Sequence, residues 1–315
     1  MRVLSIGEVL WDHCGAIVTI GGAPLNFSAH LSRLGNIVAI LSAVGQDESG
    51  QKALEEIGKL GIDRRFLQRT STAPTGSACV TTGQAGEPSS RIIHPAAYEY
   101  ASFVPMTVRE ICRFAPDWLY VGTLFHSSSH LLEQTLNLRQ SMNHLRVLYD
   151  VNLRRDNWNL RLVERLSHYA DVVKMNESEA RTFADAINIG DHQNWLREFC
   201  CEWLNRFNLE CICVSLGSAG CIIATVDTTC VVPCIPIVPV DALGAGDAFC
   251  AGFLHGWHHG WNVEDIGELS NFLGRVVASK PGAIPEWSTE ECRLLQEQFG
   301  IPPSDSTDLV EPERV

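Results

Sequence analysis

Short apolar runs alternate with segments of helical spacing along most of the chain. The first run, Arg2–Gly7, is typical of a buried strand. A later segment, Pro24–Leu34, repeats apolar side chains at helical spacing and is closed by Gly35. Because strands and helices alternate, the sequence predicts an α/β fold with a mostly parallel sheet flanked by helices. The same reasoning predicts further strands at Asn36–Val44, Asp117–Gly122, Arg146–Asn152, Ala170–Met175 and Cys211–Leu216, and further helices at Asp47–Leu60, Ala245–His259 and Val263–Lys280.

Two regions break this alternation. His13–Ile20 and Thr75–His94 are rich in threonine, glycine and β-branched residues and lack a helical period. They predict short antiparallel strands outside the main sheet, which form a small β lid at about residues 13–20 and 75–97. Residues 1–301 are expected to form one domain, and the polar, proline-containing residues 302–315 are expected to be a loose tail.

Composition narrows the range of partners. The formal net charge of −13 argues against nucleic acid or an anionic membrane as a partner, since both need a broad basic surface. No stretch approaches the ~20 apolar residues of a membrane span, and Glu8 and Asp12 interrupt what would be the apolar core of a signal peptide. The 12 cysteines include no Cys-x-x-Cys pair and are interpreted as free thiols of a cytoplasmic protein.

The strongest local signal for chemistry is the segment Val240–Phe249, which reads VDALGAGDAF. It follows an extended apolar stretch and opens a helix, so the amides of Gly244, Ala245 and Gly246 are able to point together at one anion. Asp247 ends this nest. An acid there would repel a phosphate unless it takes a proton from an attacking hydroxyl, and a base beside oriented amides is the minimal apparatus of phosphoryl transfer. The alternative is that Asp247 only caps the helix.

This segment closely resembles the C-terminal signature of the ribokinase-like (PfkB) carbohydrate kinases, Asp-Thr-x-Gly-Ala-Gly-Asp. Ala242 departs from that pattern, which has threonine at this position. Other motifs resemble the family in the same order along almost the whole chain. They are Gly21–Asn26 (GGAPLN), Val44–Asp47 with Gly50, Pro74–Gly76, Asp150–Arg154 (DVNLR), Lys174–Glu179 (KMNESE), Ser215–Gly220 (SLGSAG) and Lys280–Ala283 (KPGA). The resemblance implies a ribokinase-like fold and a sugar kinase that uses ATP and Mg²⁺.

The resemblance also implies roles on the nucleotide side. Asp247 would be the general base and Gly244, Ala245 and Gly246 the anion hole. The residues that would contact the nucleotide, its Mg²⁺ or its phosphates are Lys174, Asn176, Glu179, Ser215, Gly217, Gly220 and Asn271. For Asn176, an N-cap of the following helix is the alternative. The backbone around Asp241, Leu243, Ala278 and Gly282 would hold a monovalent cation such as K⁺.

On the acceptor side, the resemblance implies that the sugar is bound by Asp12, Gly21, Gly22, Asn26 and Arg154. Asp12 is expected to end the first strand, where a carboxylate accepts hydrogen bonds from sugar hydroxyls. The segments GEVLWD, GGAPLN and DVNLRRDNW are more similar to fructokinases than to ribokinases, so fructose is the first expected substrate. The chain lacks the arginine that many fructokinases carry after the equivalent of Gly122-Thr-Leu, and 2-keto-3-deoxygluconate, ribose and nucleosides are alternatives. A homodimer through the lid is a further hypothesis.

Two other classes of function compete with a kinase. A regulator that binds sugar or nucleotide without turnover would not need Asp247 and Gly246. A dinucleotide-binding oxidoreductase would need a Gly-x-Gly-x-x-Gly turn after the first strand, which the sequence lacks. His255, His258 and His259 have the spacing of metal ligands, but the same spacing also describes one face of a helix.

Overall fold

The computed structural model describes residues 1–15, 17–82, 88–142 and 144–287. Contacts between Cα atoms divide the chain into two units, Met1–Pro285 and Glu286–Val315. The first unit contains every helix and strand named below. The domain end expected at residue 301 and the loose tail expected at 302–315 lie outside the described residues.

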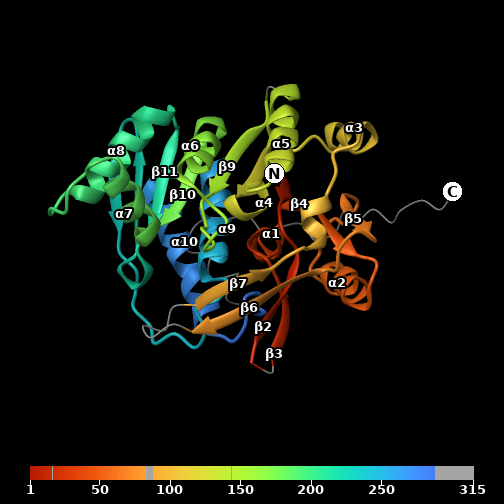
Figure 1. Ribbon diagram of the computed structural model, residues 1–315. Coiled ribbons are helices and arrows are strands. Elements are labelled where there is room, and N and C mark those ends of the chain that lie inside the picture. The colour runs from red at the N-terminus through yellow and green to blue at the C-terminus, as the bar shows by residue number, and fades with distance from the viewer. Residues whose placement is uncertain (16, 83–87, 143, 288–315) are drawn as a thin grey trace. The chain divides into compact units, whose positions relative to one another are not determined.

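A nine-stranded sheet runs through the first unit (Figure 1). Its seven strands from β11 to β5 are parallel to their neighbours, while β12 and β13 are antiparallel additions at one edge. In spatial order the strands are β13 (Thr229–Val232), β12 (Cys221–Thr225), β11 (Cys211–Ser215), β10 (Val172–Asn176), β9 (Arg146–Asp150), β8 (Trp118–Gly122), β1 (Arg2–Ile6), β4 (Ile37–Gly45) and β5 (Leu67–Thr70). The mostly parallel sheet predicted from the alternation of strands and helices is confirmed.

Helices cover both faces of this sheet (Figure 1). They are α1 (Ala23–Arg33), α2 (Glu48–Lys59), α3 (Pro105–Phe114), α4 (Thr123–His126), α5 (Ser129–Ser141), α6 (Leu160–Tyr169), α7 (Glu177–Ala186), α8 (Trp195–Phe207), α9 (Ala245–His258) and α10 (Val263–Ala278), with short 3₁₀ turns η1 (Ala97–Tyr100) and η2 (Gly217–Ala219). None of the described helices is both long and apolar enough to cross a membrane.

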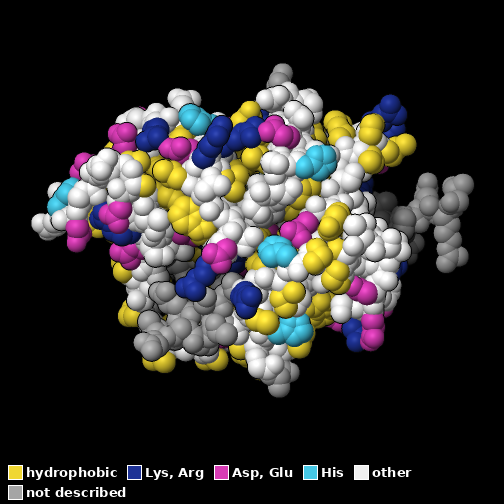
Figure 2. All heavy atoms as spheres, viewed as in Figure 1, with side chains coloured by type: hydrophobic (Ala, Val, Ile, Leu, Met, Phe, Trp, Pro, Cys, Tyr) yellow, Lys and Arg dark blue, Asp and Glu magenta, His cyan; other side chains and the backbone are white. Residues whose placement is uncertain are grey.

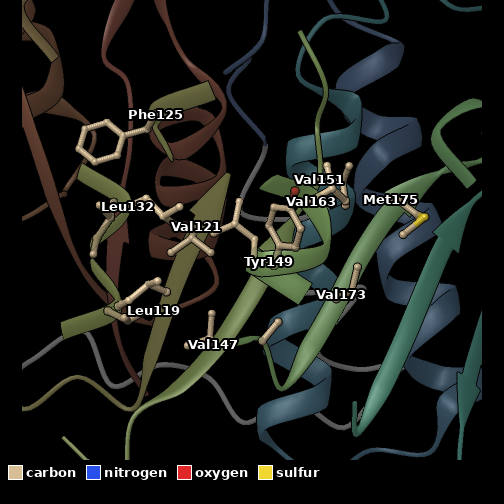
Figure 3. Close-up of a cluster of buried hydrophobic side chains, with 14 of the residues drawn as sticks. Leu119, Val121, Phe125, Leu132, Val147, Tyr149, Val151, Val163, Val173 and Met175 are labelled. Atoms are coloured by element: carbon tan, nitrogen blue, oxygen red, sulfur yellow. The ribbon is translucent and has the colours of Figure 1, made fainter. Parts of the chain in front are cut away.

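Alternate residues of each central strand feed two separate cores, as the two-residue period of a strand requires. In β8, Leu119 and Val121 point into a cluster that includes α5, α6, α7 and α8, and Figure 3 shows part of this packing. Trp118 and Tyr120 point to the opposite face, where α1, α9 and α10 pack. Because every position of such a strand is buried, the central strands are continuous apolar runs in the sequence.

A second, four-stranded sheet has the order β3 (Ile17–Gly21), β2 (Leu10–Cys14), β6 (Gly76–Thr82) and β7 (Pro88–Ile93) (Figure 1). It differs from the antiparallel lid that was expected. The pairs β2–β3 and β6–β7 are antiparallel hairpins, but β2 and β6 are parallel and join the two hairpins. The first hairpin also begins at Leu10, so a strand that the sequence did not predict forms one of its two arms.

Basic and acidic side chains are interspersed on the described part of the face seen in Figure 2. The excess of acidic side chains behind the formal net charge of −13 therefore does not gather into one acidic patch on the described part of this face.

Candidate functional site

A cavity of about 870 Å³ opens where the two sheets and several helix N-termini meet. Its walls include the carboxyl ends of β9 and β10 and the first turns of α1, α7 and α9. Carboxyl ends of parallel strands are the usual place for a ligand in such sheets. Of the predicted site residues, the cavity walls contain Asp12, Gly22, Asn26, Arg154, Lys174, Asn176, Glu179, Ser215, Gly217, Leu243, Gly244, Gly246 and Asp247.

The N-terminus of α9 is shaped by two glycines with different roles. Gly244 is the N-cap and has φ 76°, and a Cβ added there would lie 2.5 Å from the Ala283 carbonyl oxygen. Only glycine fits this left-handed, crowded position. A Cβ added at Gly246 would have its nearest neighbour at 3.5 Å, the Lys174 ammonium. Gly244 and Gly246 line the cavity, and the buried Lys174 ammonium lies beside this turn. The Ala245 amide donates to the Ala242 carbonyl at 3.3 Å and the Asp247 amide to the Gly244 carbonyl at 3.1 Å.

Asp247 lies in this first turn and is buried. Burial, together with the negative charge of Asp150, raises the pKa of Asp247 from 3.8 to about 7. The Asn26 side-chain amide opposes this by donating a 2.8 Å hydrogen bond from Nδ2 to Asp247 Oδ2. The pKa of the Asp247 carboxyl group is thus moved towards neutral pH, which suits a general base.

Lys174 and Asp150 form a buried ion pair beside Asp247. The Lys174 Nζ to Asp150 Oδ1 distance is 3.1 Å, and the Tyr120 hydroxyl donates to the other carboxylate oxygen at 2.9 Å. Burial alone would lower the pKa of Lys174, but the nearby Asp150, Glu179 and Asp247 outweigh burial and raise it. Lys174 is therefore a permanent cation under the N-terminus of α9.

Asn176 and Glu179 form a reciprocal capping box at the start of α7. Asn176 Oδ1 accepts from the Glu179 amide at 2.8 Å, and Glu179 Oε2 accepts from the Asn176 amide at 2.8 Å. The second oxygen, Oε1, accepts from the Leu153 amide at 2.7 Å. Both glutamate oxygens therefore hold backbone in place, which ties the loop after β9 to α7. The alternative N-cap role of Asn176 is what the structure contains, and both side chains still line the cavity.

The acceptor end of the cavity contains two buried carboxyl groups, Glu8 and Asp12. The expectation that Asp12 ends the first strand is wrong, because β1 ends at Ile6 and Asp12 lies inside β2 of the second sheet. Burial raises the pKa of Asp12 from 3.8 to about 6, and the Arg154 guanidinium limits the rise. A Cβ added at Gly21 would lie 2.2 Å from Asp12 Oδ2, so glycine is needed there to leave room for the carboxylate.

The two segments predicted to hold a monovalent cation are brought together by Asp241. Its Oδ1 accepts from the Leu243 amide at 2.9 Å and its Oδ2 from the Gly282 amide at 3.0 Å. The Ala278 carbonyl accepts from the amides of Val240 and Asp241. This clamp fixes the turn before α9 against the end of α10.

Some predicted residues lie elsewhere or line no part of the cavity. Asn271 donates from its buried amide to the carbonyls of Val232 and Pro233, so it fastens α10 to the end of β13. Gly220 has φ 108° and a Cβ there would meet Val232 O at 2.0 Å, which explains the glycine by the turn into β12. The described residues contain no group of three His, Cys, Asp or Glu side chains able to hold a metal ion, so the histidines of α9 do not form one.

The sequence did not single out three features of the site. Glu8 lies in the quoted segment GEVLWD and Asp150 opens DVNLR, so each stood inside a recognised motif without a role. The third is at the rim, where the Arg181 guanidinium lies 4.5 Å from the centre of the Trp195 ring. Nothing local in the sequence distinguishes this pair from ordinary surface residues.

Most of the chain is similar in sequence to proteins of one family. The family described as pfkB family carbohydrate kinase matches residues 17–290. A sugar kinase of Pyrococcus horikoshii is 27% identical, with 91% of this chain and 92% of that protein covered. An aminoimidazole riboside kinase of Salmonella typhimurium is 26% identical, with 84% of this chain and 83% of that protein covered.

Solved structures share the same architecture. A fructokinase of Xylella fastidiosa, determined with bound ATP, superimposes with a TM-score of 0.80 at 21% sequence identity. The match covers 94% of this chain and 98% of that chain.

Proposed function

This chain belongs to the pfkB family of carbohydrate kinases, and on that basis we propose that it transfers the γ-phosphate of ATP to a primary hydroxyl of a small sugar, with Asp247 as the base. One observation supports this most strongly: a buried acid with its pKa raised to about 7 lies in the first turn of a helix and lines the cavity beside Gly244, Gly246 and Lys174. Positioned amides and a poised base are what in-line phosphoryl transfer requires.

In the proposed reaction, the acceptor hydroxyl lies against Asp247 and gives up its proton to Oδ1 or Oδ2 as it attacks. Asn26 holds Oδ2 by its 2.8 Å hydrogen bond and so fixes the direction of the carboxylate. The amides of residues 244–246 and the Lys174 ammonium would stabilise the negative charge of the transferred group. Ser215 and Gly217, at the end of β11, lie on the nucleotide side.

ATP and a metal ion are implied by the family. Mg²⁺ usually keeps several waters and is held through substrate phosphates and one or two carboxylates, so it does not need a three-acid cage. Asn176 and Glu179 suit an indirect, water-mediated contact, since their oxygens are already engaged with backbone amides. We also place a monovalent cation beside the Asp241 clamp.

Fructose is the proposed acceptor. Asp12 and Asn26 line the cavity and approach each other beside Gly21, and a primary hydroxyl on an exocyclic carbon is able to extend from the ring towards Asp247. The segments GEVLWD, GGAPLN and DVNLR support fructose over ribose through their similarity to fructokinases. The aminoimidazole riboside kinase among the relatives makes a nucleoside-like acceptor the second candidate.

The central test is Asp247→Asn, assayed by ADP release over fructose, ribose, 2-keto-3-deoxygluconate and adenosine. We expect kcat to fall by about 10²–10⁴, because a general base contributes about that much, while fructose binding changes little. Parallel assays in KCl and tetramethylammonium chloride test the monovalent cation. Activity within a few-fold of wild type in the variant would exclude Asp247 as the base, and a tenfold higher kcat/KM for another acceptor would replace fructose.

A further inference from the structure

Hydrogen-bond acceptors dominate the sugar end of the cavity. Glu8 and Asp12 are 4% and 7% exposed and contribute carboxyl oxygens. Asn26 adds a third acceptor whose orientation is fixed. Because its NH₂ group donates to Asp247, its Oδ1 must face away from that carboxylate, and Oδ1 is buried with no hydrogen-bond partner. A Cβ added at Gly21 would lie 3.8 Å from this oxygen and 2.2 Å from Asp12 Oδ2, so the two acceptors converge on one spot.

Positive charge is scarce at this end. Among the described cavity residues, the cationic side chains are Arg154, Lys174 and Arg181. Lys174 is paired with Asp150, and Arg181 is paired with Asp185 on α7. The Arg154 guanidinium is thus shared by three carboxyl groups, because it lowers the pKa values of Glu8, Asp12 and Asp247 together.

From this imbalance we infer that the acceptor end selects uncharged, hydroxyl-rich molecules and discriminates against acceptors that carry a carboxylate, with Glu8 as the residue that sets this selectivity. The inference rests on the proposed sugar kinase reaction and narrows its acceptor. Hydroxyl groups supply the donors that Glu8, Asp12 and Asn26 lack. A substrate carboxylate supplies only acceptors and adds a negative charge to a buried site that already contains three acids.

Glu8 is suited to this role by its position. It lies in the loop between β1 and β2, and the Ala23 amide at the start of α1 donates towards it. Burial and the nearby Asp247 raise its pKa from 4.5 to about 7. The Tyr98 hydroxyl, from η1, is buried without a hydrogen-bond partner, and Glu8 is among the charges that raise its pKa. Glu8 therefore lines the cavity beside the start of α1.

The selectivity should strengthen as pH rises. The ionisable groups that face Glu8 are Arg154, Asp247 and Tyr98, and Asp12 shares Arg154 with it. Between about pH 6 and 8, Glu8 and Asp12 lose their protons, while the Tyr98 hydroxyl, whose pKa burial raises, keeps its proton. The negative charge that repels an anionic acceptor therefore grows across this range. Ionisation of Asp247 changes the ratio of the kcat/KM values in the same direction, because its charge also repels an anionic acceptor.

The test compares D-fructose with 2-keto-D-gluconate, which differ only in that the C1 hydroxymethyl group of the sugar is a carboxylate in the acid. We expect wild type to favour fructose in kcat/KM by about a hundredfold or more. We expect Glu8→Gln to reduce that ratio about tenfold, since removal of one buried negative charge near the substrate carboxylate is worth roughly 1.4 kcal/mol or more. Asp12→Asn should reduce the ratio in the same direction. Glu202→Gln on α8, outside the cavity wall, is the matched control and should leave the ratio unchanged.

The ratio is measured within each variant, so partial misfolding does not alter it. Binding of both molecules to Asp247→Asn, in the presence of an unreactive ATP analogue, gives a second reading without turnover. A wild-type ratio of one or less in turnover and binding, or a ratio that Glu8→Gln leaves unchanged, overturns the inference. Preferential binding of fructose with no phosphorylation of any acceptor would contradict the proposed reaction and uphold the charge selectivity.

Discussion

Asp247 is buried at a cost to stability, because its folded pKa of about 7 lies above its unfolded value of 3.8. Between these values the folded chain retains a proton that the unfolded chain has lost. Stability from this group is therefore present below about pH 4 and is lost as pH rises to about 7. Asparagine has no such penalty and keeps an oxygen for the Asn26 amide.

We therefore predict that Asp247→Asn is more stable than wild type at neutral pH, and that the difference grows between pH 4 and 8. At roughly 1.4 kcal/mol for each unit of pKa, the gain has a ceiling of roughly 4 kcal/mol. Urea unfolding at several pH values measures it. Asp247→Ala, which leaves the Asn26 amide without an acceptor, should gain less. A gain that is constant or shrinks with rising pH would contradict the assigned pKa.

At the scale of elements, two glycines at the N-terminus of α9, Gly244 and Gly246, are expected to differ in their effect on stability. We predict that Gly244→Ala destabilises the protein by about 1–3 kcal/mol, since alanine is strained at φ 76° and its Cβ would meet the Ala283 backbone. Gly246→Ala should be neutral or slightly stabilising, because its Cβ has only the Lys174 ammonium nearby and alanine favours a helix.

Both variants should lose kcat, Gly244→Ala through displacement of the turn and Gly246→Ala because a methyl group would occupy the space beside Lys174. Thermal unfolding and ADP release, measured on the same preparations, separate the two effects. Equal losses of stability in the two variants would show that crowding at Gly244 is not what the turn depends on.

The elements differ in how much the sequence revealed about them. Strands β1, β4 and β8 are buried on both faces, so each is a continuous apolar run that marks itself locally. Strand β2 is only half-buried along one side and contains Trp11, Asp12 and His13, so its signal resembles a loop. Its parallel partner β6 lies more than sixty residues further along, and no local pattern specifies that pairing.

The same limit explains the site residues. The start of α9 is encoded by consecutive residues, so the position of this helix was predictable. The burial of Glu8, in contrast, depends on α1 and on the loop after β9, which approach it only in the folded chain. The Asn271 amide likewise has its partners thirty-eight and thirty-nine residues away, in Pro233 and Val232.

At the scale of the whole molecule, the cysteines report on the integrity of the core. Eleven lie in the described residues, all as free thiols, and Cys200, Cys211, Cys213, Cys221 and Cys250 are buried. Burial also raises the pKa of the Cys200, Cys211, Cys213 and Cys250 thiols, so the reactive thiolate is scarce at these positions.

We predict that Ellman's reagent labels exposed thiols such as Cys14 and Cys201 quickly in the native protein, and that the five buried thiols react only after denaturation. Their labelling should be slow because it needs an opening of the core. Mass spectrometry of the labelled peptides assigns each site. Rapid native labelling of Cys213 or Cys250, which share the core under α1, α9 and α10, would show that these helices do not cover that face of the sheet as described.

The second sheet provides Asp12, whereas Asp247 and Lys174 belong to the main sheet and its helices. An acid proposed to bind the acceptor and the residues proposed to act on the phosphate thus lie in different segments of the chain. Substitutions in β2 and β3 are therefore able to change which acceptor hydroxyls are bound without altering the turn before α9. A family with this arrangement is able to change its acceptor specificity through the second sheet while the residues proposed for phosphoryl transfer stay the same.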